Sequence, residues 1–243
     1  MKRIYSTRTR LVAAVLLGVI VAGGFWATPS LRALAQEIID FFTQTETDEQ
    51  PSTVFVGSGL AAPEEEYVDP YTLSLDEIAA QAGFDVFLPT YIPDIMNFKG
   101  GLVSHGGQRV EMIYDCSTPW SLMIAQLKVD DLATPLEVGA SAVIEAVPIR
   151  DSIGQYVQGM WQYDVAPEII ENQGEAIEEV PVTRVWVNEL AWKRLLWRED
   201  GINFTIMTAG GIMNNDTLSP CALTKADYVA IAEGLQPAST IGQ

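Results

Sequence analysis

Residue types that commonly act in catalysis are scarce in this chain. Its one histidine, His105, lies in the run Ser-His-Gly-Gly, which is typical of a hairpin tip. We interpret it as an exposed turn residue and not as a general base. The sequence has no Cys-x-x-Cys motif, no His-rich or Cys-rich metal pattern, no glycine-rich phosphate loop and no acidic run with the spacing of a calcium loop. We therefore predict a protein that is not an enzyme and that uses no metal or cofactor.

Tryptophan is the residue type best suited to bind a ligand in this sequence, because it offers a large contact area at low entropic cost. Trp161, Trp192 and Trp197 all fall in stretches that we expect to be strands. One hypothesis is that they partly line the concave face of a curved sheet and bind a lipid or another apolar ligand. The alternative is that the aromatic side chains form the core between sheet and helices.

The two cysteines, Cys116 and Cys221, both follow the apolar N-terminal segment. If that segment directs the rest of the chain out of the cytoplasm, they lie in a compartment where disulfides persist. We expect them to pair and to stabilise the domain by about 2–4 kcal/mol. The alternative is two separate buried thiols.

The aromatic residues belong to a long region of strand-like stretches separated by turn residues. The spacing of the stretches predicts an antiparallel meander and not βαβ units. Asp200-Gly201 is typical of a two-residue type I′ turn between the last two stretches. The expected strands are residues 84–88, 101–105, 109–114, 121–128, 142–149, 155–161, 182–187, 191–199 and 202–208.

Two helices flank this region. Ser74 and Glu77 have the spacing of a capping box, which predicts a short helix that ends near Gly83. A second helix is expected to start at residues 224–227, where apolar residues then recur at helical spacing. The order of elements predicts an α+β domain at residues 73–238, with a curved, half-barrel-like antiparallel sheet and helices packed on one face.

The N-terminal segment divides the chain between compartments. Residues 1–10 carry four cations and no acid, and an apolar run follows that is long enough, at about 17 residues, to cross a bilayer. By the positive-inside rule, residues 1–10 form a cytoplasmic tail and residues 11–28 a transmembrane helix that precedes the exported domain. Ala14, Gly18 and Ala22 form a small-residue stripe through which the helix can dimerise.

A cleaved secretory signal is the alternative to an anchor. The sequence Ala33-Leu34-Ala35 fits the small-x-small pattern, and cleavage would follow Ala35. The anchor explains more residues, because 29–42 then form an amphipathic juxtamembrane helix. Both interpretations export the same domain, so we expect a single-pass protein of the cell membrane or a secreted one.

Acidic residues dominate the exported part. Four of the 14 Lys and Arg residues precede residue 11 and all 32 Asp and Glu follow it, so the net charge beyond residue 10 is 10 − 32 = −22. That charge repels nucleic acid and anionic lipid headgroups. Residues 43–72 combine acids with proline and glycine, which predicts a disordered linker.

Several motifs of the expected domain resemble a bacterial extracytoplasmic domain family of unknown function. The family occurs behind the membrane anchor of anti-sigma factors and in exported lipoproteins, and is similar in fold to lipoprotein-carrier and envelope-stress regulatory domains. The resemblance covers residues 74–237, and the segments that carry it are FLPTYIPDIMNFKGG, RVEMIYD, GQYVQGMWQYD, LAWKRLLWREDGINFTIM and TKADYVAIAEGL.

The resemblance implies a membrane-anchored sensory or binding domain in envelope or sigma-factor-linked regulation, with a protein partner in the envelope. The alternative function is a carrier that holds a lipid or other apolar ligand in the concave face of the sheet.

Overall fold

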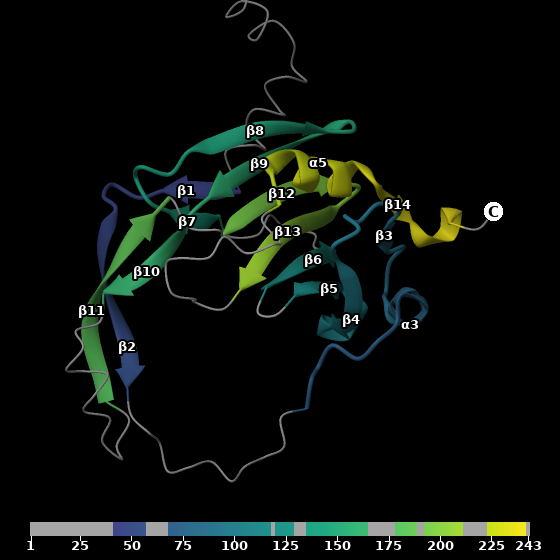
Figure 1. The fold of residues 1–243 in the computed structure, drawn as a ribbon, viewed down its shortest axis with the longest axis horizontal. Helices are drawn as coiled ribbons and strands as arrows, with labels where there is room; N and C mark the ends of the chain where they lie inside the picture. The colour runs from purple at the N-terminus through teal and green to yellow at the C-terminus, as the bar shows by residue number, and fades with distance from the viewer. Residues whose placement is uncertain are drawn as a thin grey trace, which may run out of the picture. The chain divides into compact units, whose positions relative to one another are not determined.

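The computed structural model describes residues 41–56, 68–117, 120–128, 135–164, 178–188, 192–210 and 223–241. All of them belong to the second of two compact units, which begins at Phe41. Strands dominate this unit, and two α-helices accompany a large antiparallel sheet (Figure 1). Within the described ranges no sheet closes into a barrel. No helix there is long and apolar enough to cross a membrane, and the expected anchor at 11–28 lies outside those ranges.

The large sheet has seven antiparallel strands. Their order across the sheet is β4 (Asn97–Ser104), β5 (Arg109–Ser117), β6 (Trp120–Lys128), β13 (Ile202–Gly210), β12 (Lys193–Glu199), β9 (Ser152–Gln158) and β8 (Ile144–Ile149). The hairpin between β12 and β13 turns at Asp200-Gly201, whose φ angles are +52° and +74°. Positive φ at both positions is what a type I′ turn requires, so the sequence prediction is confirmed.

Three smaller sheets accompany it. β1 (Phe42–Gln44) pairs in parallel with β7 (Leu136–Val138), and β3 (Phe87–Pro89) pairs with β14 (Leu235–Pro237). The third has the order β10 (Met160–Asp164), β11 (Glu178–Val187) and β2 (Glu49–Val56). Two short 3₁₀ turns are η1 (His105–Gly107) and η2 (Ala238–Thr240).

Both α-helices begin with a reciprocal capping box. In α3 (Leu75–Gln81) the Ser74 hydroxyl accepts from the amide of Glu77, and the Glu77 carboxylate accepts from the amide of Ser74. Thr224 and Asp227 form the same arrangement at the start of α5 (Lys225–Glu233). Each box satisfies two amides that have no partner within the helix, so both predicted helix starts are confirmed.

The larger core lies between the seven-stranded sheet and the helices. Met112, Ile124 and Trp197 alternate along their strands with residues that point to the opposite face. Ile78 of α3 and Tyr228 of α5 belong to the same buried cluster. A smaller core contains Phe42, Val138, Ala142, Val157, Trp186 and Leu196.

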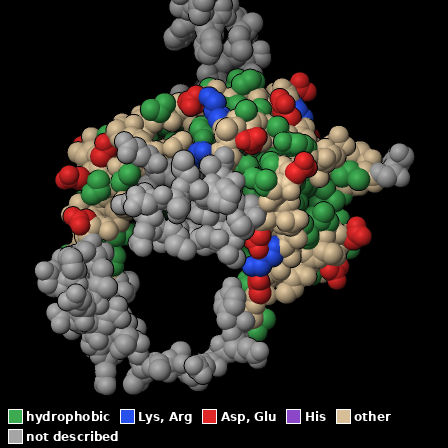
Figure 2. All heavy atoms as spheres, viewed as in Figure 1, with side chains coloured by type: hydrophobic (Ala, Val, Ile, Leu, Met, Phe, Trp, Pro, Cys, Tyr) green, Lys and Arg blue, Asp and Glu red, His purple; other side chains and the backbone are tan. Residues whose placement is uncertain are grey.

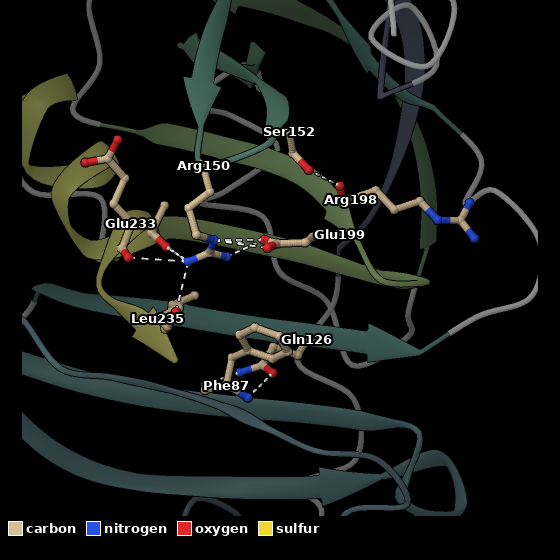
Figure 3. A network of polar contacts seen from close by, with 9 residues as sticks. Phe87, Gln126, Arg150, Ser152, Arg198, Glu199, Glu233 and Leu235 are labelled. Carbon is tan, nitrogen blue, oxygen red and sulfur yellow. Dashed lines mark hydrogen bonds and ion pairs between the residues drawn. The ribbon is translucent and has the colours of Figure 1, made fainter. Parts of the chain in front are cut away.

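Two polar contacts tie the small elements to the large sheet (Figure 3). The fully buried side chain of Gln126, on β6, accepts from the amide of Phe87 at 2.9 Å and donates to the Phe87 carbonyl at 2.6 Å. Arg150, in the turn between β8 and β9, donates to the carbonyls of Ala232 at 2.7 Å and Leu235 at 2.9 Å. The same guanidinium forms an ion pair with Glu199. It therefore binds the Ala232 carbonyl in the last turn of α5 and the Leu235 carbonyl at the start of β14.

The structure corrects the expected linker at residues 43–72. Residues 42–56 contain strands β1 and β2, and Phe42 is buried, although we expected it to end a juxtamembrane helix. The reason is tertiary: β2 pairs over eight residues with β11, more than 120 positions later in the chain. Composition alone cannot reveal such a partner. Residues 29–40 and 57–67 lie outside the described ranges.

A second correction concerns the expected strand at 155–161. It divides at Gly159, whose φ of +121° is strained for any side chain. A Cβ there would also lie 2.8 Å from the Trp186 ring. The part before Gly159 belongs to the large sheet as β9, and the part after it belongs to the three-stranded sheet as β10.

We predict that Arg150→Met lowers the free energy of unfolding by about 2 kcal/mol, because hydrogen bonds to a charged group contribute about 1.5–3 kcal/mol. Urea unfolding monitored by circular dichroism measures this. The control is Lys225→Met, which removes an exposed ion pair with Glu145 and is expected to cost less than about 1 kcal/mol. Equal losses in the two variants would contradict a special role for Arg150.

We also predict that stability falls at alkaline pH. Burial, with a smaller contribution from Glu145, raises the pKa of Tyr156 to about 12, and burial also raises the pKa of Tyr228. A tyrosine in the unfolded chain ionises near pH 10, so above that pH the unfolded state binds fewer protons than the folded state. The ionisation of these tyrosines should therefore have no effect between about pH 7 and 9, and the free energy of unfolding should fall between about pH 10 and 12.

Urea unfolding at a series of pH values tests this fall. Tyr156→Phe should make the decline with pH shallower, whereas Tyr163→Phe, at a side chain that is 53% exposed, should leave the decline unchanged. A flat profile up to about pH 12 would show that the buried tyrosines do not govern alkaline stability.

Candidate binding surface

The three-stranded sheet of β10, β11 and β2 is the candidate functional site. Its register pairs Trp161 with Trp186, and Arg184 with both Tyr163 and Gln50. Because side chains alternate along a strand, these five residues share one face, which we call the aromatic face. The neighbouring residues along each strand form the opposite face.

On the aromatic face the described side chains contact one another closely. The Trp161 and Trp186 rings meet edge to face at 5.5 Å, and the Arg184 guanidinium lies 4.5 Å from the centre of a Trp161 ring. Arg184 also forms an ion pair with Glu137 and a hydrogen bond with Gln50. The indole N–H groups donate to the Glu137 carbonyl at 3.1 Å and to Asn188 at 2.7 Å. The polar groups of the two tryptophans and of Arg184 are therefore already engaged within the domain.

A shallow, open groove of about 610 Å³ runs along β2, β11 and the end of β10, and most of its lining residues, though not Gln50 and Val182, belong to the opposite face. The residues that line it are Glu49, Gln50, Pro51, Asp164, Pro181, Val182 and Thr183. Glu49 and Asp164 are exposed, and neither forms an ion pair with another described residue. In the face that Figure 2 shows, red acidic side chains are spread over the described surface and blue basic side chains gather at a few places.

Two prolines limit the ways in which a partner can bind this sheet. Pro51 lies on β2, an outer strand of this sheet. Pro181 lies on β11, at a position where no described residue of β10 pairs with it. Proline has no backbone N–H, so neither position can donate to an added strand. The prolines therefore disfavour edge pairing along this sheet and leave its side chains as the means of recognition.

The structure does not bring the three predicted tryptophans into one site. Trp197 is fully buried in the larger core, where its ring stacks on Phe204 at 4.7 Å. Trp161 packs against the smaller core, in a different sheet. Trp192 is half-buried just before β12, and its carbonyl accepts from the Gly159 amide at 2.9 Å. Trp197 lies on the helix side because it alternates with Leu196, which faces the smaller core.

The other residues that the sequence analysis singled out lie at a hairpin tip or outside the described ranges. His105 is exposed in η1 at a hairpin tip, as predicted, and its Nδ1 lies 3.0 Å from the Ser104 hydroxyl. Among the described residues no cluster of His, Cys, Asp and Glu can hold a metal ion. Cys221, and with it the expected disulfide to Cys116, lies outside the described ranges, as do Ala14, Gly18 and Ala22.

The sequence analysis did not single out the groove. Its β2 residues fell in the expected linker, and Pro181 fell just before an expected strand at 182–187. Val180 and Val182 recur at the two-residue period of a strand, and that is the local signal that could have extended the expected strand. The partner strand β2 had no comparable signal.

No family model, curated protein or solved structure matches this chain. The resemblance to the extracytoplasmic domain family therefore stays a prediction.

The positions of the aromatic residues give a testable contrast. Trp197→Ala should lower the free energy of unfolding by about 3–5 kcal/mol, because it leaves a cavity in a closed core. Tyr163→Ala should change it by less than about 0.5 kcal/mol, because Tyr163 is exposed. Urea unfolding of both variants provides the comparison. A Trp197→Ala variant as stable as the parent would contradict a core role for this side chain.

Proposed function

We propose that this chain is a non-enzymatic, single-pass membrane protein whose exported domain binds a protein partner through the groove on β10, β11 and β2. The observation that carries the proposal is the contrast between the two faces of this sheet. On one face the tryptophans and Arg184 have their partners within the domain. On the other, two carboxylates without an ion pair among the described residues flank an open groove.

Membrane attachment and export rest on the sequence. The cations of residues 1–10 and the apolar segment 11–28 support an anchor with a cytoplasmic N-terminus. We also propose that the large sheet is curved like a half-barrel, with helices on one face. The family resemblance supports a sensory role in envelope or sigma-factor-linked regulation.

A carrier of apolar ligands has less support than a protein-binding domain. Such a carrier needs an apolar cavity. In the described part of the chain, the Trp197 and Phe204 rings stack between the large sheet and the helices, and Phe87 packs on Phe204 at 5.2 Å. These rings occupy the space where a ligand held against the helix side of the sheet would lie.

Site-specific photo-crosslinking tests the proposal in cells that produce the full chain. A photoreactive amino acid at Thr183, an exposed groove residue, should give a discrete protein adduct in the membrane fraction. The same group at Ala226, an exposed residue of α5, is the matched control and should give none. The absence of an adduct at Thr183, or identical adducts at both positions, would contradict binding through the groove.

The same fractions test the anchor separately. We expect the full-length protein in the membrane fraction. A soluble mature protein whose N-terminal sequence begins at Gln36 would show cleavage after Ala35 and would overturn the anchor, while the crosslinking result would still decide the role of the groove.

A further inference from the structure

We infer that the partner segment held in the groove is a positively charged peptide whose Lys or Arg side chains lie across the sheet face. The inference deepens the proposed function and rests on it, since it names the chemistry of the partner at the same surface.

The carboxylates of the groove stand on its two outer strands. Asp164 is in register with Thr183, which is in register with Pro51, so these three residues form one row across the sheet. Glu49 lies in the next row of the same face, on β2. Two strand spacings of about 4.8 Å separate β10 from β2, and the next row lies about 7 Å farther along the strands, so the backbones that carry Asp164 and Glu49 are about 12 Å apart.

That separation determines which kind of cation the two carboxylates can bind. A calcium or magnesium ion needs several oxygen ligands within about 2.6 Å, and backbones about 12 Å apart on a rigid sheet do not favour shared coordination of one ion. Lysine and arginine reach farther, because an aliphatic stem carries the charge away from the backbone. Each carboxylate can therefore pair with a different basic side chain of one segment.

The surface between the carboxylates suits those aliphatic stems. Pro51 and Pro181 present their rings on the groove face, and the Thr183 side chain lies in the row between Pro51 and Asp164. Lys and Arg side chains bury their methylene groups on apolar surface while the charged end stays at a polar rim. The prolines disfavour the addition of a strand at the edge, so the segment is held by its side chains.

Charge on the rest of the domain favours the same partner. The net charge beyond residue 10 is 10 − 32 = −22, which attracts a basic segment over a distance set by the ionic strength. Arg184, the cation of this sheet, lies on the aromatic face and is already paired with Glu137 and Trp161. It does not neutralise the carboxylates of the groove.

Peptide binding to the full-length protein in zwitterionic nanodiscs tests the inference. The probes are fluorescein-labelled peptides of alternating lysine and alanine, alternating glutamine and alanine, and alternating glutamate and alanine. Fluorescence anisotropy at about 50 mM salt should detect binding of the lysine peptide only, and about 300 mM salt should weaken that binding. Comparable binding of the glutamine peptide would overturn the inference, as would no binding of the lysine peptide.

Charge-matched variants separate the groove from the general field of the domain. The Glu49→Gln/Asp164→Asn variant should weaken binding of the lysine peptide about tenfold, as expected for the loss of two ion pairs. The Asp94→Asn/Glu233→Gln variant removes the same charge at exposed positions outside the groove and should weaken it less than about twofold. Equal weakening in the two variants would mean that the net charge, and not the groove, holds the peptide.

Failure of this inference can be told from failure of the proposed function. If a Thr183 adduct forms in cells but the lysine peptide neither binds nor competes with it, the groove binds a partner of other chemistry and only the inference fails. If no adduct forms at Thr183, the proposed function fails, whatever the peptide does.

Discussion

The attachment of α5 and β14 to the large sheet depends on the guanidinium of Arg150. The side chain leaves a turn with φ of +50° and binds the Ala232 and Leu235 carbonyls where the helix ends, while Glu199 neutralises its charge. β14 then pairs with β3, and β3 is bound in turn to β6 through both amide contacts of Gln126 with Phe87. These contacts close one side of the larger core: the buried Gln126 amide forms two hydrogen bonds, and the charged Arg150 forms its contacts at the edge of the core.

A second constraint acts at the small sheets. Trp186 packs where Gly139 and Gly159 leave room: a Cβ on Gly139 would lie 2.3 Å from the Trp186 side chain and one on Gly159 would lie 2.8 Å away. The Asp48 carbonyl also accepts from the Trp186 amide at 2.8 Å. The close approach orients β11 with its aromatic face toward the smaller core. Because strand side chains alternate, the same orientation turns Glu49, Pro51 and Thr183 outward. The groove is thus a consequence of how the tryptophan is buried.

The large sheet and the three-stranded sheet therefore contribute different properties to the domain. The large sheet and its helices supply stability through a closed core, in which Trp197 and Phe204 stack face to face. The three-stranded sheet presents to the outside polar groups, prolines and carboxylates that form no ion pair with a described residue. Recognition on such a surface relies on charge and on shape over a shallow area. That mode suits contact with a segment of another protein better than retention of a small apolar molecule.

Local sequence determined the features that depend on neighbouring residues: the capping boxes of Ser74 and Thr224, the turn at Asp200-Gly201 and the exposed hairpin tip at His105. Their interactions close within three or four residues, so spacing alone reveals them. The tertiary structure alone decided that residues 42–56 form strands, that Gly159 divides one stretch between two sheets, and that Trp197 and Trp161 belong to different cores. Each of these depends on a pairing or packing partner far along the chain. The residues of an acidic, proline-containing segment do not show which distant strand it pairs with.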